Sequence, residues 1–174
     1  NGLILYMDGA RLAYGLASPE NSLTLPDIAR LCDAFYIGGT KCGALFGEAL
    51  VITNERLKQD FRYIMKQRGA LLAKGFLLGA QFLALLPVMD KYAAHAISEA
   101  RRIRQALLDA DIPLYIDSPT NQIFPILPPD SPLLARLKEH FILDPWPEDT
   151  WRITTDWSTH PEDIDMLIEI IRSN

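Results

Sequence analysis

The sequence has 174 residues, and its net charge of −5 comes from 17 basic and 22 acidic side chains. Hydrophobic residues make up 49% and charged residues 22%, which is typical of a globular chain and excludes a disordered one. The acidic balance disfavours a nucleic-acid binder, which needs a basic surface to neutralise phosphates. Two cysteines cannot form a disulfide framework, so we expect a reducing, cytoplasmic setting.

The first part of the chain predicts alternating strands and helices. An apolar run at residues 3–7 is typical of a buried parallel strand with neighbours on both sides, and residues 8–22 predict an irregular, glycine-containing stretch. A capping-box pattern predicts a short helix over 26–32, and residues 34–37 form the next apolar run. Strand, helix, strand at this spacing predicts a parallel βαβ unit. A further strand is predicted over 44–53.

The middle of the chain predicts helices. They are expected over residues 54–67, 70–86 and 88–110, and the last of these carries its apolar residues on one face. The most apolar stretch, residues 76–89, contains a glutamine and a proline and is too short to cross a bilayer, so a core helix is expected and no membrane association.

The last part predicts a small α+β domain. Thr159 and Glu162 have the spacing of a capping box that opens a terminal helix reaching residue 171. The other elements expected in this part are strands at 114–116, 122–127 and 151–155 and a helix at 133–140. We place the domain boundary before the long helix, giving domains 1–87 and 88–174.

Three polar side chains follow predicted strands, where α/β proteins place ligand sites. Asp8 ends the first apolar run, Arg11 comes one short turn later, and Lys41 follows the second run. Glycines flank Lys41 and allow close approach of the backbone to a ligand, and a buried lysine amine is suited to Schiff-base chemistry. Asp8 and Lys41 together suit pyridoxal phosphate, which needs a lysine and an acidic partner for its ring nitrogen. A structural carboxylate at Asp8 remains the alternative.

Four segments resemble, in order, the motifs of a known enzyme family. Tyr-Met-Asp-Gly-Ala-Arg, which ends at Arg11, is similar to the segment His-x-Asp-Gly-Ala-Arg of the low-specificity threonine aldolases. Gly-Thr-Lys-Cys-Gly-Ala, around Lys41, resembles the family's cofactor-lysine loop. Thr-Asn-Gln-Ile-Phe at 120–124 and Trp-Arg-Ile-Thr-Thr-Asp-Trp at 151–157 are similar to two later segments. The family groups with the aromatic amino acid β-eliminating lyases among fold-type I pyridoxal-phosphate enzymes.

The resemblance implies a role for each matched residue. Lys41 is implied as the Schiff-base lysine, and Asp8 as the partner of the pyridine nitrogen. Arg11 is implied beside the cofactor ring, in contact with its phenolic oxygen or with the substrate carboxylate. Arg152 is implied as the clamp on the substrate α-carboxylate, for which a planar guanidinium is suited, with a salt bridge inside the small domain as the alternative. Thr40 is implied near the cofactor phosphate.

The sequence differs from the family's pattern in the segment around residue 68. Arg68 and Gly69 stand where the family commonly has a Gly-Gly-Gly-x-Arg-Gln run that contributes to the neighbouring subunit's site. The phosphate contacts across subunits are therefore in doubt, with Arg68 as the candidate substitute. The three histidines have no metal-ligand spacing, so we expect no metal site.

The implied fold is the remainder of a fold-type I large domain followed by a small α+β domain. The implied activity is that of a lyase that cleaves the Cα–Cβ bond of a β-hydroxy-α-amino acid such as threonine, giving glycine and an aldehyde. Racemisation and β-elimination start from the same cofactor chemistry and stay open. Family members are about twice as long, so we expect the carboxy-terminal portion of such an enzyme, and a truncated, non-catalytic chain is the alternative. A homo-oligomer, dimer or tetramer, is implied as well.

Overall fold

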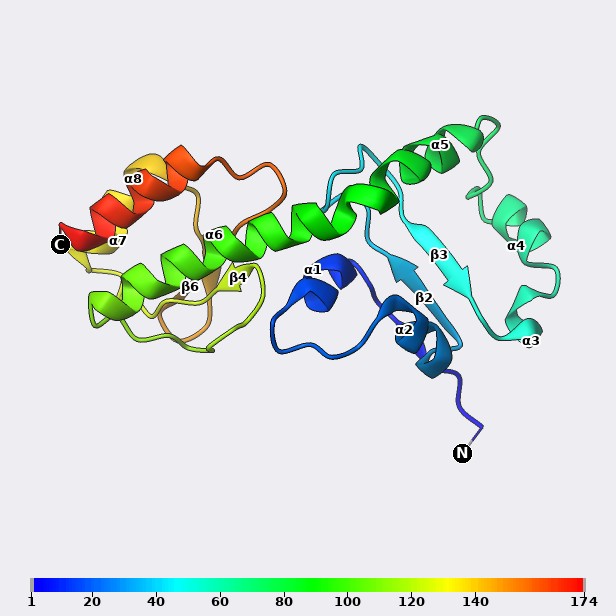
Figure 1. Cartoon of the computed structure of the whole chain (residues 1–174), viewed down its shortest axis with the longest axis horizontal. Helices are drawn as coiled ribbons and strands as arrows, with labels where there is room; N and C mark the ends of the chain where they lie inside the picture. The colour runs from blue at the N-terminus through cyan, green and yellow to red at the C-terminus, as the bar shows by residue number, and fades with distance from the viewer. Residues whose placement is uncertain (1, 174) are drawn as a thin grey trace. The chain divides into compact units, whose positions relative to one another are not determined.

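The computed structural model describes residues 2–173, and its contacts divide the chain into two compact units. The first unit runs to Leu16 and continues over Asn21–Asp90, and the second comprises Ala17–Glu20 and the chain from Lys91 onward. Both can be followed along the chain in Figure 1. The division falls inside the long helix, close to the predicted boundary between residues 87 and 88. That these parts fold as separate domains stays a prediction.

The first unit contains a three-stranded sheet of order β1-β2-β3. β1 and β2 are parallel, with Met7 opposite Phe35, which confirms the predicted βαβ unit. β3 is antiparallel to β2, with Tyr36 opposite Leu50. The elements that begin in this unit are β1 (Tyr6–Met7), α1 (Leu12–Ala17), α2 (Leu25–Leu31), β2 (Ala34–Ile37), β3 (Ala49–Ile52), α3 (Glu55–Lys58), α4 (Phe61–Gln67), α5 (Phe76–Leu85), the 3-10 turn η1 (Leu86–Val88) and α6 (Met89–Asp109).

Some predictions for this unit are wrong, for local reasons. β1 is an edge strand with Tyr6 56% exposed, because only β2 pairs with it among the described strands. Helix α1 forms where an irregular stretch was predicted. The strand predicted over 44–53 begins only at Ala49, because Gly47 has a φ of 81° in the preceding loop. The helix predicted over 54–67 is broken at Asp60, whose φ of 54° is left-handed.

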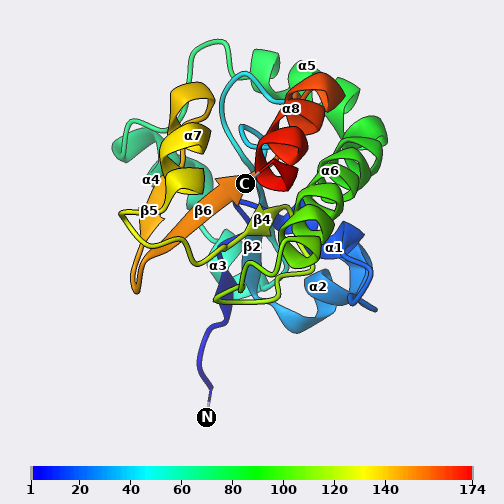
Figure 2. The same cartoon turned by 90° about the vertical axis from the view of Figure 1, so that its left-hand side faces the viewer.

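The second unit contains a sheet of order β4-β6-β5, with every pairing antiparallel. Figure 2 shows β6 between β4 and β5. The long helix α6 packs its apolar face here, with Ile103 and Leu107 fully buried beside Leu137 and Ile171. The other elements of this unit are β4 (Gln122–Ile123), α7 (Pro132–His140), β5 (Asp144–Trp146), β6 (Thr150–Thr154) and α8 (Pro161–Arg172).

The second unit also departs from its predicted elements. The strand predicted over 122–127 is only the short β4, because Pro125 has no N–H to donate to a ladder, and Leu114 forms an isolated bridge with Pro125. β5 was not predicted. The capping box at Thr159 is wrong: His160 precedes α8 as its N-cap, and the Thr159 hydroxyl accepts instead from the N–H of Asp156 at 2.8 Å.

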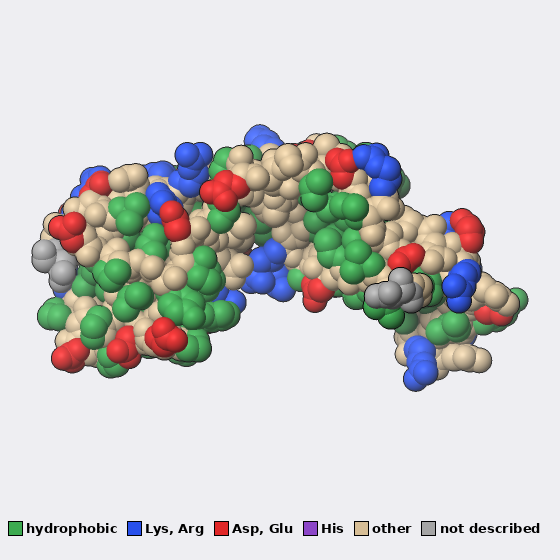
Figure 3. Space-filling view, turned by 90° about the horizontal axis from the view of Figure 1, so that it is seen from below, with side chains coloured by type: hydrophobic (Ala, Val, Ile, Leu, Met, Phe, Trp, Pro, Cys, Tyr) green, Lys and Arg blue, Asp and Glu red, His purple; other side chains and the backbone are tan. Residues whose placement is uncertain are grey.

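Hydrophobic side chains also lie on the surface, as the green areas of Figure 3 show.

The stretch Phe76–Asp109 is helical over 34 residues and is long and apolar enough to pass the length and composition criteria for a membrane span. This is weak evidence, because core helices of soluble proteins pass the same criteria.

Candidate functional site

Two glycines bring the ends of β1 and β2 together. The N–H of Gly38 donates to the carbonyl of Gly9 at 2.9 Å. A Cβ on Gly9 would lie 1.7 Å from the carbonyl oxygen of Tyr36, and a Cβ on Gly38 would lie 2.2 Å from that of Ala10. Only residues without a side chain fit this crossing. Asp8 and the loop that carries Lys41 are thereby held at the same end of the parallel pair.

Asp8 is exposed and accepts two hydrogen bonds on one carboxylate oxygen. The Tyr36 hydroxyl donates to Oδ1, and the N–H of Ala10 donates to the same atom at 3.0 Å. Both bonds stabilise the charged carboxylate, and with a smaller contribution from the positive charge of Lys41 they lower the pKa of Asp8 below its usual value of 3.8. Asp8 is therefore a fixed anion at neutral pH.

Lys41 lies in the turn that follows β2. The Tyr14 hydroxyl donates to the Lys41 carbonyl, and the Gly39 carbonyl accepts the N–H groups of Cys42 and Ala44 at 2.9 and 3.0 Å. This anchors the backbone of the loop to α1 and to itself. The residue itself is exposed, so the expectation of a buried amine is wrong for this chain. The positive charge of Lys41 nevertheless interacts with the Asp8 carboxylate and contributes to lowering its pKa.

Thr40 contacts an acidic residue that the sequence did not single out. Its hydroxyl donates to Oε1 of Glu48 at 3.3 Å, while the other oxygen of Glu48 accepts the N–H of Gly39. Glu48 therefore closes the loop between β2 and β3 onto itself. A role of Thr40 at a cofactor phosphate stays a prediction.

Arg11 lies at the start of α1, in the segment that follows Asp8. It is half-buried, and its guanidinium forms no hydrogen bond or ion pair with any of residues 2–173. A half-buried guanidinium without a protein partner is available to bind an anion.

Arg152 lies on β6 in the second unit. Its Nε and one terminal nitrogen donate to Oδ2 of Asp144 at 3.2 and 2.7 Å, and the other terminal nitrogen lies 3.5 Å from Oε1 of Gln122. The guanidinium carbon is 5.7 Å from the ring centre of Trp146. This ion pair is the alternative that the sequence left open, and the carboxylate-binding role stays a prediction.

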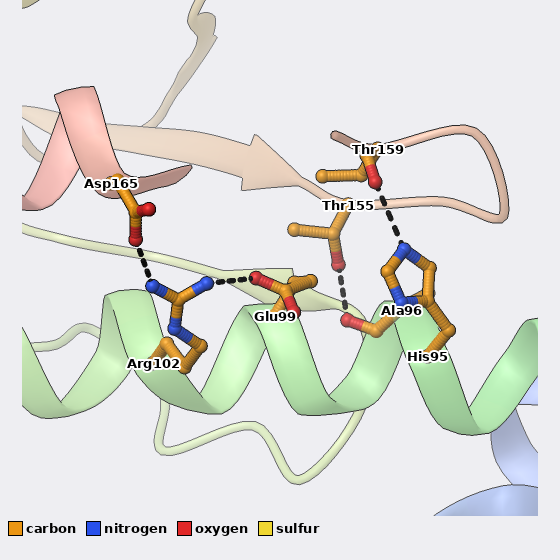
Figure 4. A network of polar contacts seen from close by, with 7 residues as sticks. All are labelled: His95, Ala96, Glu99, Arg102, Thr155, Thr159 and Asp165. Carbon is orange, nitrogen blue, oxygen red and sulfur yellow. Dashed lines mark hydrogen bonds and ion pairs between the residues drawn. The ribbon is translucent and has the colours of Figure 1, made fainter. Parts of the chain in front are cut away.

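The Thr-Asn motif is buried in the second unit. Asn121 is 1% exposed; its side-chain N–H group donates to the carbonyl of Thr155 at 2.6 Å, and its Oδ1 has no hydrogen-bond partner among the described residues. The Thr155 hydroxyl donates to the carbonyl of Ala96 at 2.7 Å and so ties the end of β6 to α6. Further contacts of α6 in Figure 4 are His95 with Thr159, Arg102 with Glu99 and Arg102 with Asp165.

The contacts of Tyr36 with Asp8 and of Glu48 with the Lys41 loop were not predicted from the sequence. Tyr36 was assigned only to a strand, and Glu48 only to the next strand. The alternation of side chains along β2 could have placed Tyr36 on the same sheet face as Asp8, but nothing in the sequence indicates that its hydroxyl meets Oδ1. Among residues 2–173, no cluster of three or more His, Cys, Asp or Glu side chains is placed to hold a metal ion.

The chain is similar to threonine aldolases in sequence and in structure. The low specificity L-threonine aldolases of Pseudomonas sp. (strain NCIMB 10558) and of Pseudomonas aeruginosa are 38% and 37% identical to this chain over 118 residues, 64% of it. The structure of Leishmania major threonine aldolase superposes with a TM-score of 0.92 at 43% identity over 99% of this chain. No family model matches the sequence. The chain spans 32% of the length of the two Pseudomonas relatives and 52% of the Leishmania chain.

Proposed function

We propose that this chain is part of a threonine aldolase and carries the lysine of a pyridoxal-phosphate lyase site, because it is similar to threonine aldolases in sequence and in fold over part of their length. The predicted fold class, part of a fold-type I large domain followed by a small α+β domain, is confirmed by the same superposition. The proposed reaction cleaves the Cα–Cβ bond of a β-hydroxy-α-amino acid such as threonine, giving glycine and an aldehyde.

The observation that supports this function is the pairing of Asp8 and Lys41 at one end of the β1–β2 pair. Asp8 is a carboxylate with one oxygen that forms no hydrogen bond with residues 2–173, and Lys41 supplies an exposed amine whose charge interacts with this carboxylate. This donor set fits pyridoxal phosphate, which supplies an electron sink when bound. Lys41 would hold the cofactor covalently through Nζ, and Asp8 would keep a proton on its ring nitrogen.

Arg11 and Arg152 are proposed to bind anionic groups of the cofactor and the substrate. Arg11 forms no hydrogen bond or ion pair with the described residues and would contact the phenolic oxygen of the cofactor or the substrate carboxylate. Arg152 would orient the substrate α-carboxylate, for which it has to exchange its bond to Asp144. An ion pair exposed to this degree contributes little, about 0–1 kcal/mol, so the exchange costs little.

The test is direct binding of pyridoxal phosphate to the 174-residue chain. We expect a visible absorption band that is lost in Lys41→Ala and kept in Lys91→Ala, which removes an exposed lysine on α6. Reduction with borohydride, followed by peptide mass spectrometry, should locate the adduct at Lys41. A band that survives in Lys41→Ala, with adducts spread over other lysines, would contradict the proposal.

A second candidate is a chain that folds but does not hold the cofactor. Its support is that Asp8 and Lys41 are both exposed. It predicts no band in the isolated chain. Where a band appears, product analysis with threonine separates the lyase, which releases glycine, from a racemase or a β-eliminating enzyme, which do not.

We also propose a homo-oligomer. Apart from Gln81, helix α5 consists of apolar residues and glycine, yet Phe76 is 70% and Leu83 is 78% exposed. Exposed apolar surface of this kind is typical of protein interfaces. Sedimentation should give more than the 19.6 kDa of one chain, and Leu83→Lys should shift the distribution toward the monomer.

A further inference from the structure

Tyr36 lies beside Asp8 on the neighbouring strand. β1 and β2 are parallel with Met7 opposite Phe35, and Asp8 and Tyr36 are the residues that directly follow this pair. Side chains directly opposite in a sheet project to the same face. The Tyr36 hydroxyl uses this position to donate a hydrogen bond to Oδ1 of Asp8.

The two oxygens of Asp8 are not equivalent. Oδ1 accepts from both the Tyr36 hydroxyl and the Ala10 N–H, whereas Oδ2 has no hydrogen bond with any of residues 2–173. Two donors on one oxygen, one from the neighbouring strand and one from its own turn, fix the rotation of the carboxylate about its side-chain bonds. The free oxygen therefore has a defined direction.

We propose that Tyr36 is a positioning residue that fixes the Asp8 carboxylate with Oδ2 presented to the protonated ring nitrogen of the cofactor. The inference rests on the proposed function, because it concerns the same carboxylate. Tyr36 acts through Asp8 and is not proposed to touch the substrate.

The hydrogen bond from Tyr36 also affects the basicity of the Asp8 carboxylate. A donor on Oδ1 stabilises the carboxylate and makes it less basic, so a proton between Asp8 and the ring nitrogen of a bound cofactor would stay on the nitrogen. The same contact, with the nearby carboxylate charge, raises the pKa of Tyr36 to about 12. Tyr36 therefore keeps its proton and remains a donor throughout the neutral pH range.

The first test needs no cofactor. Carbon-13 NMR of the aspartate carboxyls should show that Asp8 titrates at higher pH in Tyr36→Phe than in the unmodified chain, with Asp8→Asn identifying its resonance. Tyr6→Phe is the matched control: its ring centre lies 6.4 Å from that of Tyr36, and its hydroxyl forms no hydrogen bond with the described residues. An unchanged Asp8 titration in Tyr36→Phe overturns the proposal.

The second test measures pyridoxal phosphate binding by absorbance. We expect about threefold to tenfold weaker binding in Tyr36→Phe, the range for the net contribution of a typical hydrogen bond, and no change in Tyr6→Phe. Equal affinity of Tyr36→Phe and the unmodified chain overturns the inference alone. Absence of a cofactor band in the unmodified chain overturns the proposed function and, with it, this inference, so the two failures are distinguishable.

Discussion

The N–H of Gly38 meets the carbonyl of Gly9 at 2.9 Å, where the ends of β1 and β2 cross. The crossing holds Asp8 and the Lys41 loop at one edge of the sheet, and it leaves no room for a side chain on either glycine. The geometry of the candidate site therefore depends on two residues that carry no functional group.

Gly9→Ala should destabilise the first unit by about 3 kcal/mol, the upper end of the typical range for overpacking, because its Cβ would lie 1.7 Å from the Tyr36 carbonyl oxygen and the backbone must shift. Gly15→Ala is the control. Gly15 lies inside α1 with nothing within 4 Å of the added Cβ, so it should stabilise by about 0.5–1 kcal/mol. Urea denaturation measures both. Equal stability of the two variants would show that the crossing is not as tight as described.

Asp33 should make the first unit sensitive to acid. Its carboxylate accepts the N–H of Leu5 at 2.8 Å and the side-chain amide of Asn54 at 2.7 Å, and these bonds lower its pKa below 3.8. Because the folded-state pKa is the lower one, the stabilisation is present above the unfolded pKa and is lost as the pH falls through the folded value.

The thermal midpoint of Asp33→Asn should therefore lie below that of the unmodified chain at pH 7, with the difference shrinking as the pH falls below 3.8. Asp130→Asn is a suitable control, because Asp130 is exposed and forms no hydrogen bond with the described residues. A difference between Asp33→Asn and the unmodified chain that is constant down to low pH would argue against a charge-dependent contact.

Thr155→Val should destabilise the second unit by about 1–3 kcal/mol, because it removes the hydroxyl that donates to the Ala96 carbonyl in a fully buried position. Thr154→Val makes the same chemical change at the preceding residue, the last of β6, which is exposed, and about 0.5 kcal/mol or less is expected there. Chemical denaturation monitored by tryptophan fluorescence distinguishes them. Equal effects would contradict the assigned contact.

The ion pair of Arg152 with Asp144 should contribute about 0.2–1 kcal/mol, because both side chains are partly exposed. A double-mutant cycle of Arg152→Ala and Asp144→Ala measures this coupling in the free chain. If Arg152 binds the substrate carboxylate, Asp144→Ala should in addition lower the apparent Kd for the amino acid, since it frees the guanidinium. Weaker substrate binding in Asp144→Ala would favour a purely structural role.

The residue types at the site could be predicted from the sequence. Asp8 and Lys41 follow apolar runs, and the ends of parallel strands meet at one edge, so their proximity follows from periodicity and glycine placement alone. Helices whose apolar faces are regular, such as α6, were also predicted, because this signal is carried by residues close together in the chain.

Contacts through space were decided only by the tertiary structure. Three such contacts join different elements of the chain, and no local sequence pattern predicts them. They are the hydrogen bond of Tyr36 to Asp8, the closure of the loop by Glu48 and the ion pair of Arg152 with Asp144. The exposure of Lys41 and of β1 is likewise set by which strands pair, because burial depends on neighbours in space. The sequence by itself determined which chemical groups are present and near which strand ends. The packing of the chain decided which of their atoms are bonded and which, like Oδ2 of Asp8, form no hydrogen bond with the described residues.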